Sequence, residues 1–338
     1  MAILVTGGTG YIGSHTVVDL LNHNYDVVIV DNYVNSKPEV LNRIYKITGK
    51  KPRFYEIDVC NEEKMRELFQ KENITDIIHF AGLKSVAESV EKPDLYFSNN
   101  IGSSKVLLKL MSEFDVRNIV FSSSATVYGV PDHVPLKEDD KIGGCTNPYG
   151  QTKLDIEYLL YDYAKEHKEA NIAILRYFNP IGAHESGLIG EDPQGIPNNL
   201  MPYITQVAVG KRPFLNVYGN DYKTHDGTGV RDYIHVVDLA SGHLAALKKL
   251  ESKPGLVIYN LGTGKGTSVL DLVHAFEKAN GIKIKYEIKA RRPGDVDENY
   301  ADASKAYREM GWKAKLNIVD ACRDSWNWQK NNPNGYDK

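Results

Sequence analysis

Apolar and polar positions in the first 180 residues follow the pattern of strands that alternate with helices. Short apolar runs predict strands at 2–6, 26–30, 53–57, 76–80, 118–122 and 172–177. Apolar residues at helical spacing predict helices at 14–21, 61–71, 95–113 and 149–167. Such alternation is typical of a parallel sheet with helices on both faces. We therefore expect an α/β fold with a doubly wound, mostly parallel sheet.

The pattern changes after Phe178. Residues 179–199 are rich in Gly, Pro, Asn and Asp and predict a loop. A later apolar run at 256–261 predicts a strand that returns to the sheet, and 268–280 predicts a helix. We expect a first domain over 1–180, completed by returning segments near 235–262, and a smaller mixed α/β domain over most of 181–338.

Composition narrows the class of protein. The 41 Lys and Arg residues against 44 Asp and Glu residues give a net charge of −3, which disfavours a nucleic-acid partner. An apolar run of membrane-spanning length and a secretion signal are both lacking, so we expect no membrane association. Three scattered cysteines favour a reducing, cytoplasmic location. The ten histidines show no metal-binding spacing, and we predict no metal.

A glycine-rich loop joins the first predicted strand to the first helix. Gly7, Gly10 and Gly13 leave room for a pyrophosphate to reach the backbone amides at the start of that helix. Asp31 ends the next strand, where a carboxylate accepts hydrogen bonds from a ribose 2′-hydroxyl and repels a 2′-phosphate. Together these features predict a Rossmann domain that binds NAD rather than NADP.

A serine, a tyrosine and a lysine form the candidate catalytic group. Tyr149 and Lys153 lie four residues apart on a predicted helix and therefore share one face. Ser124 follows a predicted strand, at the sheet edge where such folds bind ligands. Tyr161 and Lys165 repeat the same spacing without a serine at the matching distance, so we interpret that pair as structural.

These motifs together resemble the extended short-chain dehydrogenase/reductase family. Further segments are similar to the UDP-glucose 4-epimerases within it: 79–84 (HFAGLK), 122–129 (SSSATVYG), 176–180 (RYFNP), 195–202 (GIPNNLMP) and 229–235 (GVRDYIH). The similarity extends over essentially the whole chain. It implies reversible interconversion of UDP-galactose and UDP-glucose with tightly bound NAD, and it implies a homodimer.

The resemblance also implies a mechanism. Tyr149, as phenolate, would take the proton of the sugar 4-hydroxyl while C4 gives a hydride to NAD. Lys153 would hold the ribose and lower the pKa of Tyr149, and Ser124 would contact the 4-oxygen. Related 4,6-dehydratases need a carboxylate beside the serine or threonine, whereas Ala125 and Thr126 carry none. This difference favours the epimerase.

The resemblance assigns the remaining contacts residue by residue. The cofactor site would comprise Gly7, Gly10, Tyr11, Ile12, Gly13, Asp31, Asn32, Asn35, Ser36, Asp58, Val59, Phe80, Ala81, Gly82, Lys84, Asn99, Ser124, Tyr149, Lys153, Tyr177 and Phe178. The UDP-sugar site would comprise Lys84, Ser124, Ala125, Thr126, Tyr149, Phe178, Asn179, Asn199, Leu200, Asn216, Val217, Tyr218, Arg231, Tyr233, Val269, Arg292, Asp295 and Asn299.

Asn299 departs from the family pattern. It stands where strictly glucose- and galactose-specific enzymes carry a bulky tyrosine against the sugar 2-position. The smaller side chain leads to the hypothesis that UDP-N-acetylhexosamines are also substrates.

Two other function classes remain open. One is a nucleotide-sugar dehydratase or reductase with net chemistry. The other is a non-catalytic NAD-sensing regulator, which the presence of Ser124, Tyr149 and Lys153 disfavours.

Overall fold

The computed structural model describes residues 2–292 and 294–337. Its centre is a sheet of seven parallel strands in the order β11-β6-β5-β4-β1-β2-β3. These strands are β1 (Ala2–Thr6), β2 (Val27–Asp31), β3 (Arg53–Glu56), β4 (Ile74–His79), β5 (Asn118–Ser124), β6 (Asn171–Tyr177) and β11 (Leu256–Leu261). All seven strands lie where the apolar runs predict them, within two residues at either end. The doubly wound α/β fold is thus confirmed.

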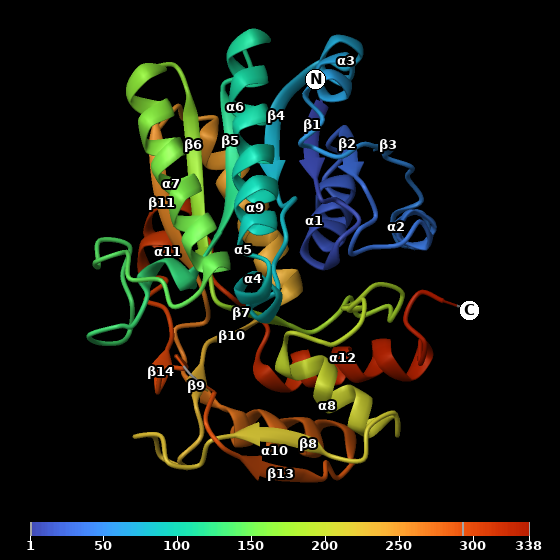
Figure 1. Cartoon of the computed structure of the whole chain (residues 1–338). Helices are drawn as coiled ribbons and strands as arrows, with labels where there is room; N and C mark the ends of the chain where they lie inside the picture. The colour runs from blue at the N-terminus through green and yellow to red at the C-terminus, as the bar shows by residue number, and fades with distance from the viewer. Residues whose placement is uncertain (1, 293, 338) are drawn as a thin grey trace.

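Helices cover both faces of this sheet (Figure 1). One face packs against α1 (Tyr11–Asn22), α2 (Glu39–Thr48) and α9 (Val236–Leu250). The other packs against α3 (Glu62–Lys71), α6 (Gly102–Glu113) and α7 (Pro148–Glu166). The strands other than the edge strand β3 consist mainly of β-branched and other apolar residues, as is typical of strands with both faces buried.

The helix predicted at 95–113 has a mixed backbone. It consists of α5 (Pro93–Tyr96), a π-helical segment η1 (Phe97–Ile101) and then α6, and the short helix α4 (Val86–Glu91) precedes it. Asn100 lies in the π-helical segment, and its side chain is buried and bonded to Leu83 and Thr152. Among the described helices none is both long and apolar enough to cross a membrane.

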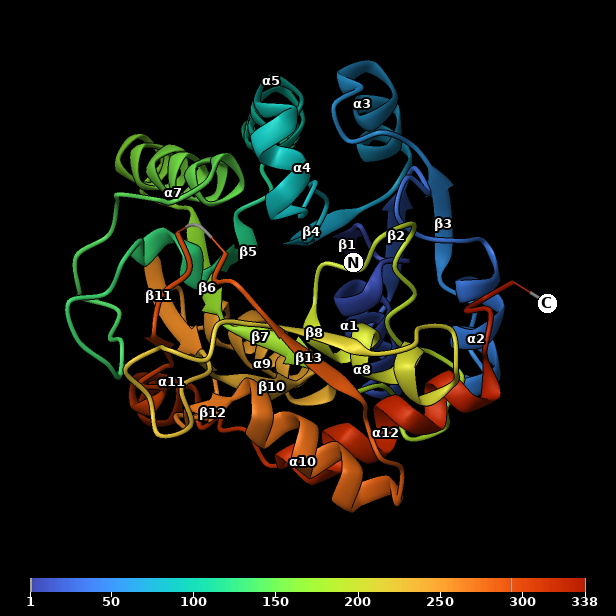
Figure 2. The same ribbon diagram turned by 60° about the horizontal axis from the view of Figure 1, so that its bottom comes forward.

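The C-terminal part forms a separate core beyond one end of the sheet (Figure 1). Its helices are α8 (Leu200–Ala208), α10 (Val269–Asn280) and α12 (Ile318–Asn331), whereas α11 (Ser304–Met310) packs against β11 and α9 of the large sheet. Its short strands pair as β7 (Asn179–Ile181) with β10 (Tyr233–His235), β8 (Leu215–Tyr218) with β13 (Tyr286–Lys289), and β9 (Val230–Arg231) with β12 (Thr267–Ser268) and β14 (Glu298–Asn299). Figure 2 shows α10 and α12 on the opposite side of the molecule from α3 and α7.

The order in which the chain adds parallel strands reverses in the middle of the sheet. The chain runs from β1 outward through β2 and β3, then returns to the other side of β1 with β4. Loops that follow β1 and β4 therefore leave in opposite directions and open a crevice at the carboxyl ends of the strands, which is where such sheets bind ligands.

Candidate active site

A cleft of about 1120 Å³ lies at these carboxyl ends and continues toward the C-terminal part. Every residue predicted to bind the cofactor lines it. So do most of the predicted UDP-sugar contacts, from Lys84 and Ser124 to Asn299. The fold thus brings residues separated by nearly 300 positions in the chain to one cavity.

The glycine loop at the start of α1 has no space for side chains. A Cβ at Gly13 would lie 2.2 Å from the carbonyl oxygen of Gly7, and Gly7 itself has a φ of +68°. Gly10 stands at the N-cap and offers no side chain to the free amides of the helix. These amides face the cleft and remain available to an anionic ligand. The residues present therefore fit the pyrophosphate of a dinucleotide.

Asp31 is held at the end of β2 by its neighbours. One carboxylate oxygen accepts hydrogen bonds from the backbone of Tyr33 and the hydroxyl of Ser36, at 2.9 and 3.1 Å. The other accepts one from the backbone of Thr9, at 3.1 Å. Since these bonds fix the carboxylate at the edge of the cleft, Asp31 has the position required to accept a bond from a ribose hydroxyl.

Ser124, Tyr149 and Lys153 meet at the centre of the cleft. Ser124 is the last residue of β5 and caps the 3₁₀ helix η2 (Ala125–Tyr128). Lys153 donates a hydrogen bond of 2.8 Å to the carbonyl oxygen of Ser122, and its Nζ lies 6.0 Å from the centre of the Tyr149 ring.

Burial dominates the titration of this group. It raises the pKa of Tyr149 to about 12, against the hydrogen bond with Ser124, which acts in the opposite direction. Burial also lowers the pKa of Lys153 to about 8, against the attraction of the Glu157 carboxylate. We expect Lys153 to lower the pKa of Tyr149, but in the protein without ligands it does not, because its ammonium group is directed toward the carbonyl oxygen of Ser122.

The second tyrosine–lysine pair is structural, as the sequence predicts. The hydroxyl of Tyr161 donates a hydrogen bond of 2.9 Å to the buried carboxylate of Glu157. Lys165 pairs with Asp162 on the exposed face of α7. Neither Tyr161 nor Lys165 lines the cleft.

Two arginines and a carboxylate lie at the far end of the cleft. Arg231 and Arg292 both pair with Asp295. The guanidinium of Arg292 also lies 5.2 Å from the centre of the Tyr218 ring. The two guanidinium groups can form paired hydrogen bonds with phosphate oxygens, and the aromatic ring can stack on a nucleotide base.

Two polar side-chain atoms in the wall of the cleft lack a hydrogen-bond partner among the described residues. They are Oγ1 of Thr126 and Oδ1 of Asn299, and both are buried. Because an unpaired buried polar atom is costly, such atoms mark places where a ligand would supply the missing bond.

Five predicted contacts are not brought to the cleft lining. Val217, Tyr233 and Val269 pack into the C-terminal core, and Leu200 begins α8 with its side chain against the same core. Asn216 lies on the exposed face of β8. In these places the resemblance identifies the segment, whereas the packing directs most of the side chains away from the cleft.

Several residues that line the cleft were not predicted from the sequence. They include Ser85, Glu191, Asn198 and Tyr336. Glu191 is a buried carboxylate in the segment predicted only as a loop, and burial raises its pKa. No local pattern marks it, because its partners Lys84 and Asn199 are brought to it only by the fold.

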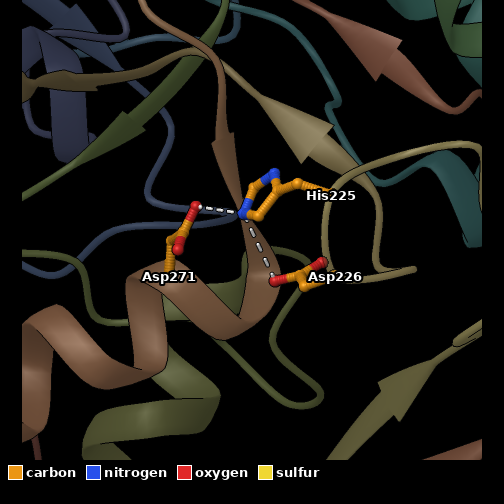
Figure 3. Close-up of side chains that lie close together, drawn as sticks. All are labelled: His225, Asp226 and Asp271. Carbon is orange, nitrogen blue, oxygen red and sulfur yellow. Dashed lines mark ion pairs between the residues drawn. The ribbon is translucent and has the colours of Figure 1, made fainter.

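A group outside the cleft has ligand-type side chains (Figure 3). Nε2 of His225 lies 3.0 Å from a carboxylate oxygen of Asp271 and 3.7 Å from one of Asp226. Both carboxylates already accept bonds from Ser268, the N-cap residue of α10. The group therefore stabilises the start of this helix, and we assign no metal to it.

Comparison with known proteins agrees with this geometry. The family model of GDP-mannose 4,6 dehydratase matches residues 4–325. UDP-glucose 4-epimerase from Pasteurella multocida (strain Pm70) is 59% identical over 336 residues, which cover 99% of both chains. The structure of UDP-glucose 4-epimerase from Bifidobacterium longum in complex with NAD+ and UDP has a TM-score of 0.95 and 55% identity, covering 99% of this chain and 100% of that one.

A more distant structure belongs to an enzyme whose name includes a second sugar. The UDP-Glc/GlcNAc 4-epimerase from Campylobacter jejuni has a TM-score of 0.85 and 33% identity, covering 98% of this chain and 99% of that one. The glycine loop, the serine and the tyrosine–lysine pair on this sheet define the extended short-chain dehydrogenase/reductase class. Within that class, the chain belongs to the UDP-glucose 4-epimerase family.

Proposed function

We propose that the protein is an NAD-dependent isomerase that interconverts UDP-galactose and UDP-glucose by transient oxidation at C4 of the sugar. One observation carries the proposal: Ser124, Tyr149 and Lys153 meet beside the glycine loop in a single cleft, and residues 125 and 126 add no acid. The positions next to Ser124 thus lack the acid that would expel a 6-hydroxyl, which argues against the dehydratase chemistry named by the family model.

NAD, when bound, supplies the acceptor for the C4 hydride and returns that hydride to the sugar. The amides at the start of α1 would hold its pyrophosphate and Asp31 its adenosine ribose. Tyr149 would remove the proton from the 4-hydroxyl, with Ser124 bonded to the same oxygen. Because burial raises the pKa of Tyr149 to about 12, the phenolate needs added positive charge, which the oxidised nicotinamide and a reoriented Lys153 would provide.

The far end of the cleft is proposed to bind the UDP group. Arg231 and Arg292 would exchange their contacts with Asp295 for the diphosphate, and Tyr218 would stack on the uracil. Asp295 keeps the two cations paired and in place until the diphosphate arrives.

We further propose that UDP-N-acetylhexosamines are accepted. The support is Asn299, which lines the cleft and whose buried Oδ1 lacks a partner among the described residues. A 2-acetamido group offers an N–H that would satisfy this oxygen, whereas a tyrosine would fill the space. The similarity to the UDP-Glc/GlcNAc 4-epimerase from Campylobacter jejuni adds to this support.

We also propose a domain boundary, an oligomeric state and a location for the protein. The domain boundary near residue 180 is supported by the separate core of the C-terminal part. A homodimer is supported by the exposed Leu95 and Tyr158 on the outer faces of α5 and α7. A cytoplasmic location is supported by three free cysteines.

The first test is to incubate the purified protein with UDP-galactose, without added NAD, and to follow the sugar by proton NMR. We expect UDP-glucose to form and the same mixture to be reached from either sugar. The Tyr149→Phe variant should lose this activity, whereas Tyr161→Phe should retain it as the matched control. A 4-keto-6-deoxy product would instead establish a dehydratase and refute our interpretation of Ala125.

A further inference from the structure

Two polar contacts join the opposite walls of the cleft. The ammonium of Lys84 lies 3.6 Å from a carboxylate oxygen of Glu191. The hydroxyl of the next residue, Ser85, donates a hydrogen bond of 2.9 Å to the side-chain oxygen of Asn198. Lys84 and Ser85 follow β4 of the large sheet, whereas Glu191 and Asn198 belong to the segment between β7 and α8. We call these four residues, all of which line the cleft, the clasp.

The sheet side of the clasp is firmly anchored. Ser85 caps α4, and its hydroxyl accepts a hydrogen bond from the backbone of Glu88. Its own backbone amide donates to the hydroxyl of Tyr96, which in turn donates to the carboxylate of Glu88. The Ser85 hydroxyl therefore has a fixed position from which to reach across the cleft.

The other side of the clasp is anchored as well. The side chain of Glu191 is only 10% exposed, and the amide of Asn199 donates to it a hydrogen bond of 2.7 Å. The indole of Trp328 donates to the backbone carbonyl of Glu191 and ties this segment to α12. Asn199 stands at the N-cap of α8 without capping it, because its amide is directed to Glu191 instead.

We propose that the clasp holds the walls of the cleft together while the oxidised sugar turns, and so determines how often that sugar escapes before the second half of the reaction. This inference rests on the proposed function. An epimerase must present both faces of one keto sugar to the same hydride donor, so the sugar has to rotate while its UDP group stays bound. Contacts between the protein walls restrain opening without binding the sugar and hindering that rotation.

Escape at this stage has a defined chemical result. Oxidation at C4 takes two electrons and one proton from the C–H bond as hydride, and a second proton from the 4-hydroxyl. If the 4-keto sugar leaves, the hydride stays on the cofactor and the second proton stays on Tyr149. The protein then carries reduced cofactor and stops turning over, which makes each escape countable.

The test compares Ser85→Ala, Asn198→Ala and the double variant with the unchanged protein. The reduced cofactor is measured by its fluorescence, and the released keto sugar is trapped by borodeuteride and identified by mass spectrometry. We expect the ratio of escape to completed epimerisation to rise about two- to tenfold in each single variant, the range for one lost hydrogen bond. The double variant should show no more than the larger single effect, since both changes remove the same contact.

Controls separate the clasp from general damage. Ser85→Thr keeps the hydroxyl and the helix cap and should restore the normal ratio. Ser98→Ala removes an exposed hydroxyl that donates a bond to the backbone carbonyl of Leu95 and lies outside the cleft, and should change nothing. An unchanged ratio in all single variants, or additive effects in the double variant, would overturn the clasp. If the unchanged protein fails to convert UDP-galactose, the proposed function fails instead.

Discussion

Replacing Glu157 with glutamine tests how the interior of α7 supports the site. The Glu157 carboxylate is fully buried and accepts hydrogen bonds from Ser123, Tyr161 and the guanidinium of Arg176, and the shortest bond with each partner is 2.6 to 2.9 Å. Arg176 is itself only 1% exposed. The variant keeps the shape of the side chain but leaves the arginine charge buried without its counterion.

The expected loss of stability is large. Removing one partner of a buried ion pair costs about 3–5 kcal/mol. With about 2.1 cal/mol/K of unfolding entropy per residue, a chain of 338 residues has about 0.7 kcal/mol/K, so Tm should fall by about 4–7 °C. Thermal unfolding of the NAD-loaded protein, followed by calorimetry, measures this shift.

The same change should alter the pH profile. Glu157 lies one turn after Lys153, and its carboxylate opposes the effect of burial on the lysine, whose pKa is about 8. Without this charge the pKa of Lys153 falls further, and the ammonium is lost at lower pH. If the ammonium form is required, the alkaline limb of kcat/KM against pH moves toward lower pH.

A matched control is Glu169→Gln, which alters an exposed carboxylate that pairs with His167. It should leave both Tm and the pH profile unchanged. The reasoning is refuted if Glu157→Gln unfolds within about 1 °C of the unchanged protein, because the buried charge would then be compensated in another way. A lower Tm with an unmoved alkaline limb would refute only the link to Lys153.

Three shorter predictions concern ligand binding. Asn299→Tyr should reduce turnover of UDP-N-acetylhexosamines while sparing UDP-galactose in the same NMR assay; equal loss of both would contradict the role of this position. Gly13→Ala should weaken NAD binding more than tenfold, because the new Cβ would lie 2.2 Å from the carbonyl of Gly7; Gly102→Ala, at a helical position where the new Cβ would make only an ordinary contact of 3.5 Å with Sγ of Cys60, is the control, and equal affinity in both would count against a tight cradle. Asp31→Ala should weaken NAD about ten- to hundredfold in a fluorescence titration and NADP much less; a parallel loss for both would show that the carboxylate does not discriminate.

Much of the fold can be predicted from the sequence because the patterns that indicate its strands and helices are local. Six of the seven strands are short, mainly apolar runs, with β3 (Arg53–Glu56) the exception, and the helices between them carry apolar residues at regular spacing. The glycine loop, Asp31, and the pair Tyr149 and Lys153 are likewise recognised from neighbours within one or two turns. Ser124 is found because it ends a strand, so its position in the cleft follows from the direction of the sheet.

The remaining features depend on residues far apart in the chain. Ser85 meets Asn198 across 113 positions, and the Glu157 ion pair forms only when β6 lies beside α7. Neither contact leaves a periodic pattern. The direction of a side chain on a short strand, as at Val217, depends on which face the neighbouring core covers. A single sequence does not specify that face.

The late return of the chain to the sheet has a consequence for synthesis on the ribosome. Strand β6 is an inner strand of the sheet only because β11, residues 256–261, pairs with its free edge. Helix α9, residues 236–250, covers one face of the sheet. Until about residue 261 of 338 has emerged, a strand whose centre is apolar and part of one sheet face stay open to solvent. Unpaired edges of this kind associate readily with other chains. The nascent protein therefore depends on chaperone binding or rapid elongation through this stretch, and truncation before β11 should yield aggregates rather than a smaller cofactor-binding unit.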